Sequence, residues 1–389
     1  MKLAARLLAV TLILCPALAA AEGSGKATAA GKGIPPKAEV LSLVRKVNSY
    51  QLANPYVDAW EAANPVDAQI KRPWTRATWY TGVMAMWKAT KDPAFLDQAI
   101  RYGHDLAWGV GEEQLGGNRL FPIEIWTEIY FAKNDRSMIE PAIRWLDTPD
   151  PLTPAGQKRW YLDSRDPAEG PPVPYIDSTY GGPALAMLAK ATGDKKYLDI
   201  LTAFLDDVMG VLQDPETGLF YRDPRFIGRQ TKNGKKILWS RGNGWVYAAL
   251  PRVLDYLPKD HPSREHYLAV YRRMSAELVR RQGADGLWRA NLDDPDEFPD
   301  PETSGSGFFC FGLAWGVNHR VLNRREYLPA VAKAWHGLSQ SVSPEGKVLW
   351  GQLVDDRPHT TARESSHEYV TGTFLLAGSE VYKLARGKP

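Results

Sequence analysis

Lys88-Ala89-Thr90-Lys91-Asp92-Pro93-Ala94-Phe95-Leu96-Asp97 returns later in the chain as Lys190-Ala191-Thr192-Gly193-Asp194-Lys195-Lys196-Tyr197-Leu198-Asp199. In each copy a turn aspartate, Asp92 or Asp194, is followed by an aromatic residue and a leucine. An aspartate in this place can accept hydrogen bonds from the free amides of the next helix, and the aromatic and leucine side chains begin the apolar face of that helix. The repeated phrase therefore predicts a joint between two helices.

Looser copies of the joint occur further along the chain. They lie at Ala132-Lys133-Asn134-Asp135, at Leu257-Pro258-Lys259-Asp260 before Tyr267-Leu268, and at Leu322-Asn323-Arg324 before Tyr327-Leu328. Successive joints are 43, 59, 66 and 64 residues apart, and the chain ends a similar distance after the last one. Five joints and a terminal one predict six helical hairpins, an all-α (α/α)6 barrel whose inner helices line a central cavity. An open helical solenoid fits the same pattern and is the alternative.

Three other segments share a turn glycine that is followed by a short extended piece. They are Glu216-Thr217-Gly218-Leu219-Phe220-Tyr221, Ala284-Asp285-Gly286-Leu287-Trp288-Arg289 and Glu345-Gly346-Lys347-Val348-Leu349-Trp350. Glycine is suited to turns that need a positive φ, so these segments are predicted to be excursions between helices.

The N-terminus has the pattern of a secretory signal peptide. Lys2 and Arg6 precede an apolar run over residues 7–18, and small residues follow, so we expect residues 1–21 to be removed. Residues 22–36, rich in Gly, Ala, Lys and Pro, are predicted to be a flexible leader, and residues 37–389 a single catalytic domain. A periplasmic or secreted protein with no membrane contact after cleavage is expected.

Charge and cysteine content limit the classes of partner. Loss of Lys2 and Arg6 reduces the formal net charge from +3 to +1, which gives no reason to expect binding to nucleic acid. Only Cys310 would remain, so no intrachain disulfide is expected. The acidic run over residues 293–297 lacks the alternating ligands and turn glycine of a calcium loop, and no phosphate-binding or dinucleotide motif occurs. We therefore assign no metal and no cofactor.

Trp239-Ser240-Arg241-Gly242-Asn243-Gly244-Trp245 brings together groups that bind acidic sugars. Trp239 and Trp245 offer aromatic faces on which a sugar ring can stack, and Arg241 offers a planar cation for a carboxylate. The two glycines allow the backbone to approach a ligand closely. An alternative is a helix N-terminus whose tryptophans belong to the core. An acidic oligosaccharide is the first ligand to consider.

Asp177 lies in Pro174-Tyr175-Ile176-Asp177-Ser178-Thr179-Tyr180-Gly181-Gly182-Pro183, just before an amphipathic helix predicted over 184–192. Between Tyr175 and Tyr180 its carboxyl would be partly desolvated, which raises the pKa of a carboxylic acid and suits it to proton donation. The simpler interpretation is that Asp177 caps the following helix.

Two further polar segments have both a structural and a functional interpretation. In Pro301-Glu302-Thr303-Ser304-Gly305-Ser306-Gly307-Phe308-Phe309, Thr303 or Ser304 is expected to cap an aromatic helix. In His367-Glu368-Tyr369 the histidine either binds an acidic ligand or is simply exposed on a loop.

Five segments of the chain, in order, resemble the unsaturated glycuronyl hydrolases, and particularly the unsaturated rhamnogalacturonyl hydrolases, of glycoside hydrolase families 88 and 105. The similarity extends from about Trp74 to Leu384. The segments are Thr75-Arg76-Ala77-Thr78-Trp79-Tyr80-Thr81-Gly82, the Asp177 segment, the heptapeptide from Trp239 to Trp245, Glu302-Thr303-Ser304-Gly305, and Leu375-Leu376-Ala377-Gly378-Ser379-Glu380-Val381-Tyr382.

The resemblance implies an (α/α)6 barrel and exo-acting removal of a 4,5-unsaturated uronic acid from the non-reducing end of lyase-generated oligosaccharides. Asp177 matches the family's aspartate that protonates C4 of the double bond, after which water adds at C5 and the hemiketal opens to release the neighbouring sugar. The candidate substrate-binding residues are Trp239, Arg241 and Trp245, which match the uronate subsite, with Asn118, Tyr180, Arg222 and His367. Arg222 lies near the position where many relatives place a histidine.

The chain departs from the family at Asn118, which occupies a position where relatives usually carry an aspartate; Glu124 occupies that of a glutamine. A second carboxylate would raise the pKa of Asp177 by repulsion, and neutral Asn118 cannot. Either Glu124 takes over, or desolvation suffices, or activity is altered or absent. The alternative functions are an inverting glycosidase or sugar epimerase on the same barrel, and an inert protein that binds acidic oligosaccharides.

Overall fold

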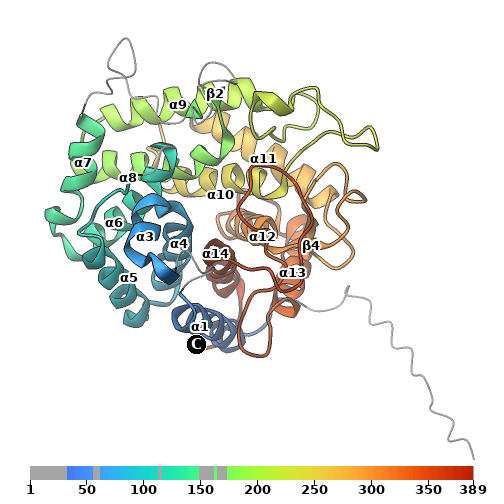
Figure 1. Cartoon of the computed structure of the whole chain (residues 1–389), viewed down its shortest axis with the longest axis horizontal. Helices are drawn as coiled ribbons and strands as arrows, with labels where there is room; N and C mark the ends of the chain where they lie inside the picture. Colours follow the sequence, from blue (N-terminus) through green and yellow to red (C-terminus); the bar gives the residue numbers. More distant parts are fainter. Residues whose placement is uncertain (1–32, 56–61, 113–115, 149–161, 164–172, 389) are drawn as a thin grey trace, which may run out of the picture.

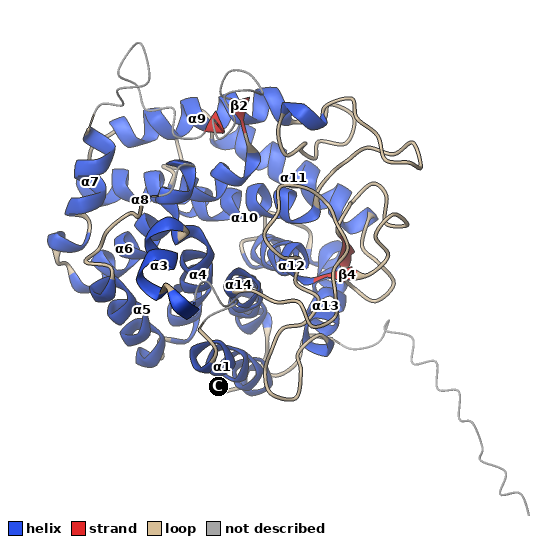
Figure 2. Ribbon diagram, viewed as in Figure 1, coloured by secondary structure: helices blue, strands red, loops and turns tan. Residues whose placement is uncertain are grey.

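The computed structural model describes residues 33–55, 62–112, 116–148, 162–163 and 173–388, so the expected signal peptide lies outside the described residues. Within these residues, two concentric rings of helices make up the molecule (Figures 1 and 2). The inner ring contains α4 (Pro73–Thr90), α6 (Leu120–Lys133), α8 (Gly182–Thr192), α10 (Ser240–Tyr256), α12 (Thr303–Asn318) and α14 (Glu368–Leu384). The outer ring contains α1 (Lys37–Ala53), α5 (Pro93–Asp105), α7 (Glu140–Asp147), α9 (Lys196–Leu212), α11 (Arg264–Arg280) and α13 (Arg324–Gln340).

The inner ring is closed. Each inner helix packs against the next one in chain order, and α14 returns to pack along α4, while α1 packs on α14 (Figure 1). The sixth hairpin is thus formed by the two ends of the chain. Closure excludes the open solenoid and confirms the (α/α)6 barrel.

Burial differs between the two rings for a geometric reason. Inner helices have neighbours on every side, and all residues of α8 from Gly182 to Ala189 are buried. A helix does occupy the predicted residues 184–192, as part of α8, but the prediction that it is amphipathic is wrong. Outer helices bury one face, as α9 does with Tyr197, Leu201, Leu205 and Val208 at helical spacing.

The predicted joints connect inner to outer helices. Asp92 caps α5 and Asp194 accepts a hydrogen bond at the start of α9, each from a backbone amide at 3.0 Å. Asp135 caps η3 (Arg136–Met138), the short helix that precedes α7. Asp260 caps no helix, because α11 begins later without a side-chain cap. The spacing of the joints was therefore a better guide than the identity of each capping residue.

Short helices and extended pieces complete the described chain. The short helices are α3 (Pro65–Lys71), η2 (Gly116–Arg119), η5 (Ile176–Gly181) and η6 (Pro224–Phe226). The strands pair antiparallel, β1 (Leu162–Asp163) with β2 (Val173–Pro174) and β3 (Trp288–Arg289) with β4 (Pro301–Glu302). The turn glycines of the three recurrent segments, Gly218, Gly286 and Gly346, all have positive φ, as predicted. No described helix is both long and apolar enough to cross a bilayer.

Candidate active site

A cavity of about 500 Å³ opens where the inner helices begin. Its walls come from the starts of α4, α6 and α10, from η2 and η5, from the segment before η6, and from the loop that precedes α14. The lining residues are Arg72, Trp74, Asn118, Phe121, Asp177, Arg222, Trp239, Arg241, Trp245, Val354, Asp355 and Asp356. Helix N-termini carry partial positive charge, so this end of the barrel favours an anionic ligand.

Asp177 is held by one of its two carboxylate oxygens. Oδ2 accepts a hydrogen bond from Arg222 Nε at 3.0 Å, whereas Oδ1 is buried without a partner among the described residues. Gly181 occupies the capping position of α8 and Tyr175 that of η5, so Asp177 caps neither helix. Burial raises the pKa of the Asp177 carboxyl above its usual value, although Arg222 and Arg241 counteract part of the increase. This combination suits a proton donor.

Arg222 is committed to neighbouring carboxylates. Its side chain is 3% exposed, and Nη1 donates to Asp223 Oδ2 at 2.9 Å while Nε holds Asp177. The guanidinium also lies over the ring of Tyr175, 5.0 Å from the centroid. Arg222 lines the cavity, and its guanidinium contacts Asp177, Asp223 and Tyr175.

Aromatic side chains form the other walls of the cavity. Trp239 Nε1 donates to Gln352 Oε1 at 2.7 Å, which fixes the orientation of the indole. Trp245 packs against Tyr180 with ring centroids 4.8 Å apart. Trp74 lies edge to face with Trp245 at 6.0 Å. Tyr180 therefore supports Trp245 from the core and is absent from the cavity wall, which differs from its predicted contact with substrate.

Arg241 lines the cavity and also holds the loop before α14. Nη1 donates to the Gln352 carbonyl oxygen at 2.8 Å, and Nη2 donates to the Leu353 carbonyl oxygen at 3.0 Å. The guanidinium lies between two rings, 4.6 Å from the Trp239 centroid and 4.9 Å from that of Tyr369. Arg241 therefore brings a positive charge to the cavity wall, while both of its terminal nitrogens donate hydrogen bonds to the loop.

His367 is buried, contrary to the expectation of an exposed loop residue. It caps α14 by accepting from the Glu368 backbone amide at 2.9 Å, and its ring stacks on Tyr369 at 4.5 Å. Burial, together with the positive charges of Arg241 and Arg72, lowers the pKa of His367 to about 3. The residue is therefore neutral at ordinary pH, and it is not among the residues that line the cavity. This position does not favour direct binding of an acidic ligand by His367.

Glu124 does not take over the role of the missing aspartate. Its carboxylate is buried on α6 and accepts from Arg252 Nη1 at 2.5 Å, away from the cavity lining. Burial raises the pKa of Glu124 to about 7, against the opposing effect of Arg252. The residue is part of a buried ion pair behind the site.

The capping residue of α12 also differs from the prediction. Glu302 accepts from the backbone amides of Ser304 at 2.8 Å and Gly305 at 2.7 Å. Glu302 thus takes the capping role that was expected of Thr303 or Ser304.

Sequence reasoning missed part of the cavity wall. The missed residues are Arg72, Trp74, Phe121, Val354, Asp355 and Asp356. Trp74 directly precedes the first matched segment and could have been found there. Asp355 and Asp356 lie in an irregular loop, where no periodicity or turn motif indicates the direction of a side chain.

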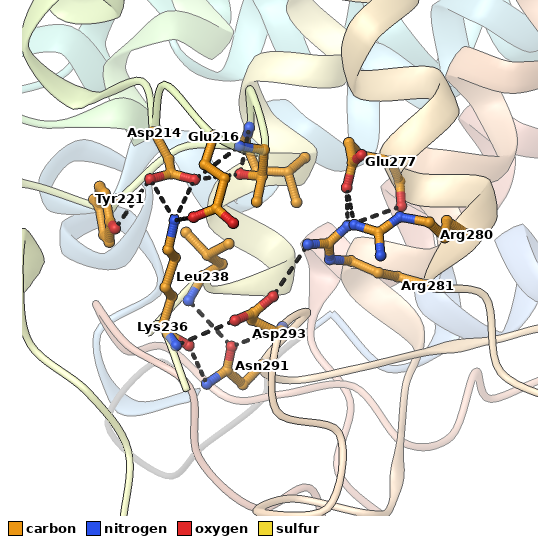
Figure 3. A network of polar contacts seen from close by, with 12 residues as sticks. Asp214, Glu216, Tyr221, Lys236, Leu238, Glu277, Arg280, Arg281, Asn291 and Asp293 are labelled. Carbon is orange, nitrogen blue, oxygen red and sulfur yellow. Dashed lines mark hydrogen bonds and ion pairs between the residues drawn. The ribbon is translucent and has the colours of Figure 1, made fainter. Parts of the chain in front are cut away.

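A polar network fixes the segment that leads into α10 (Figure 3). Lys236 Nζ binds Asp214 at 2.8 Å and Glu216 at 2.7 Å, and Asn291 accepts from the Leu238 amide at 3.1 Å. Asp293, from the acidic run, accepts from Arg281 at 3.1 Å and so has a structural role. Among the described residues, no three His, Cys, Asp or Glu side chains are placed to hold a metal.

A closed helical barrel whose cavity combines tryptophans, arginines and a buried carboxyl with a raised pKa is typical of a carbohydrate-active enzyme. The model of Glycosyl Hydrolase Family 88 matches residues 43–385. The chain belongs to this family and is a glycoside hydrolase.

Individual relatives agree with this assignment. The chain is 33% identical over 339 residues to the unsaturated 3S-rhamnoglycuronyl hydrolase of Formosa agariphila, covering 84% of this chain and 88% of that protein. It is 39% identical over 208 residues to a protein of the same name from Alteromonas sp. (strain LOR), covering 53% of this chain and 50% of that one. A glycosyl hydrolase family 88 structure from Bacteroides vulgatus superimposes with a TM-score of 0.75 at 26% identity, covering 90% of this chain and 99% of that one.

Proposed function

We propose that this glycoside hydrolase removes a 4,5-unsaturated uronic acid from the non-reducing end of oligosaccharides produced by polysaccharide lyases. The protonated Asp177 carboxyl gives its proton to C4 of the double bond, and water adds at C5. The proton that water loses returns to the Asp177 carboxylate, so the residue ends the cycle as it began. The hemiketal at C5 then opens and the neighbouring sugar is released.

The observation that carries this proposal is the different surroundings of the two carboxyl oxygens of Asp177. One oxygen is held by Arg222, and the other is buried at the cavity wall with no hydrogen-bond partner in the described part of the chain. A general acid must be protonated at the working pH, and desolvation favours the protonated form. The position of the carboxyl and the upward shift of its pKa both support Asp177 as the proton donor.

The cavity wall supports a uronate as the sugar that is removed. Trp239, Trp245 and Trp74 offer faces for stacking, and Arg72 and Arg241 bring positive charge. The name of the Formosa agariphila relative makes substrates of the 3S-rhamnoglycuronyl type the first to test.

A second candidate is an inverting glycosidase, because the carboxylates of Asp355 and Asp356 line the same cavity as Asp177. Inverting enzymes use two carboxyl groups roughly 6.5 to 9.5 Å apart and have no need of a double bond in the substrate. Turnover of a saturated uronide would favour this mechanism over hydration.

The testing experiment compares unsaturated and saturated uronyl disaccharides. Hydration of the double bond removes its ultraviolet absorbance, so turnover is followed directly. We expect absorbance to fall with the wild type and turnover to drop by at least about 10³-fold in Asp177→Asn, which cannot donate the proton. Asp97→Asn removes a carboxylate from the exposed side of α5 and should leave the rate unchanged.

Other outcomes would reject the proposal. Binding of the oligosaccharide without turnover of any substrate would point to an inert binding protein. Release of sugar with the double bond intact would point to the inverting glycosidase.

We further propose that the enzyme is exported, because Lys2 and Arg6 precede an apolar run at the N-terminus. N-terminal sequencing of protein recovered from periplasm and medium would test this; a mature protein that keeps residues 1–21 would contradict it.

A further inference from the structure

A continuous chain of ion pairs connects Asp177 to the loop before α14. Arg222 binds both Asp177 and Asp223. Arg225 Nε donates to Asp223 Oδ1 at 2.9 Å, and Arg225 Nη2 donates to Asp356 Oδ2 at 2.8 Å. Charges alternate along the whole chain, from the catalytic carboxyl at one end to Asp356 at the other. Both ends line the same cavity.

The loop that carries Asp356 is built to hold its position. Gln352 is fully buried, and its side-chain amide donates to the Arg357 carbonyl oxygen at 2.8 Å, directly beyond Asp356. The Gln352 amide oxygen accepts from Trp239, and its backbone carbonyl accepts from Arg241. Two residues of the heptapeptide from Trp239 to Trp245 therefore hold this loop in place. Within the loop, Arg357 Nε donates to Asp356 Oδ1 at 2.7 Å.

On the side of η2 and α6 the cavity has no carboxylate of its own, since Asn118 is neutral and Glu124 is paired with Arg252 outside the cavity lining. We propose that Asp356 is a positioning residue that supplies the second carboxylate of the site from the loop before α14. The inference rests on the proposed function, because it concerns how Asp177 stays protonated for that reaction.

Asp356 is suited to this role by its own ionisation. Burial alone would raise its pKa, but hydrogen bonds from Arg357 and Arg225 and the charge of Arg222 lower the pKa of Asp356 to about 2. It is therefore a permanent anion at any pH where the enzyme works. Repulsion from this anion adds to burial in raising the pKa of Asp177.

Other charged groups act on Asp177 from the elements around it. Arg222 and Arg241 oppose protonation of its carboxyl, from the segment before η6 and from α10 respectively. Arg72, at the start of α4, and Asp355, beside Asp356, complete the charged groups of the cavity wall. Removal of the Asp356 charge would leave burial alone to oppose the arginines, so the pKa of Asp177 would fall.

The test measures the Asp177 titration directly, by NMR of protein carrying ¹³C at aspartate carboxyl carbons. The resonance of Asp177 is assigned by its loss in Asp177→Asn. In Asp356→Asn we expect the midpoint to fall by roughly half to one pH unit, because one nearby negative charge is lost. Asp356→Glu keeps the charge and should leave the midpoint near its wild-type value.

Asn118→Asp provides the reciprocal variant. It places an acid on the wall of the same cavity, so it should raise the midpoint, and combined with Asp356→Asn it should return the midpoint toward wild type. A purely structural role of Asp356 would not be rescued in this way. Asp355→Asn, on the same loop and the same cavity wall, is the matched control and should shift the midpoint much less.

Enzyme kinetics give an independent measure. With an unsaturated substrate, the basic limb of the kcat/KM profile should shift in parallel, and activity of Asp356→Asn at a pH above the limb should fall about three- to tenfold while recovering at lower pH. An unchanged Asp177 midpoint in Asp356→Asn, or an equal shift in Asp355→Asn, would overturn the inference. Absence of turnover in the wild type would instead reject the proposed function, and the NMR result would still decide the role of Asp356.

Discussion

Burial is the largest influence on the pKa values of two ionisable residues near the cavity, Asp177 and His367. His367 was expected to meet solvent or an acidic ligand, yet it stacks on Tyr369 and caps α14. Its pKa is lowered to about 3 in the folded chain. An ordinary histidine titrates near 6.5, so the folded state resists a proton that the unfolded chain accepts.

The stability of the protein should therefore depend on pH through His367. Well above pH 6.5 His367 is neutral in both states and does not affect stability. As the pH falls from 6.5 toward 3 the protein loses stability, because only the unfolded state binds the proton. The residue should lower the free energy of unfolding by about 1.4 kcal/mol between pH 7.5 and 5.5. His367→Asn keeps a capping side chain but cannot titrate, so urea unfolding of this variant should show that much less pH dependence.

The matched control is His266→Asn, which changes an exposed histidine of α11. This variant should keep the pH dependence of the wild type. Equal pH dependence in His367→Asn and the wild type would mean that the pKa of His367 is not lowered by folding.

The sequence indicated some site residues and missed others for a physical reason. Asp177, Trp239, Arg241 and Trp245 lie at helix starts, where a local motif sets the direction of the side chain, and all four line the cavity. Asp356 reaches the same cavity through contacts with residues more than a hundred positions away in the chain. Such contacts leave no periodic or turn signal in a single sequence.

At the scale of elements, the loop before α14 acts as one wall of the site because Arg241 bridges two of its carbonyl groups. The helix joints were predictable, since capping and apolar spacing are local properties. The complete burial of the inner helices was not predictable, because a helix with apolar residues on every face has the same sequence pattern in a barrel as in any other buried position.

Arg241→Lys should loosen this loop. Lysine keeps the charge but has a single nitrogen, which cannot reproduce the planar fork of arginine that reaches Gln352 and Leu353 together. Loss of a charged hydrogen bond costs about 1.5 to 3 kcal/mol, so hydrogen exchange of amides in residues 352–357 should accelerate about tenfold or more. Mass spectrometry of peptides from this loop measures the change.

Arg273→Lys is the matched control, because Arg273 donates to the carbonyl oxygens of Pro215 and Glu216 on another loop. Faster exchange should then be confined to that loop. Unchanged exchange over residues 352–357 in Arg241→Lys would show that the loop is held without Arg241.

At the scale of the whole molecule, the barrel depends on the contact between its first and last inner helices. Gly82 of α4 lies against the backbone of Gly372 in α14, and a Cβ atom at Gly372 would overlap the Thr78 carbonyl oxygen and the backbone of Trp79. The absence of two side chains lets helices from opposite ends of the chain meet. Ring closure places the starts of α4 and α14, and with them Trp74 and the loop carrying Asp356, at one cavity.

Gly372→Ala should therefore destabilise the protein although alanine is the better helix former. The added methyl group meets backbone, which cannot move aside as a flexible side chain can, so the free energy of unfolding should fall by roughly 1 to 3 kcal/mol or more. Gly210→Ala is the matched control, because Gly210 is exposed on outer helix α9 and nothing lies within 4 Å of its added Cβ. That variant should gain roughly 0.4 to 1 kcal/mol. Urea unfolding of both variants measures the difference, and a gain in stability in both would mean that the ring closes without this close backbone contact.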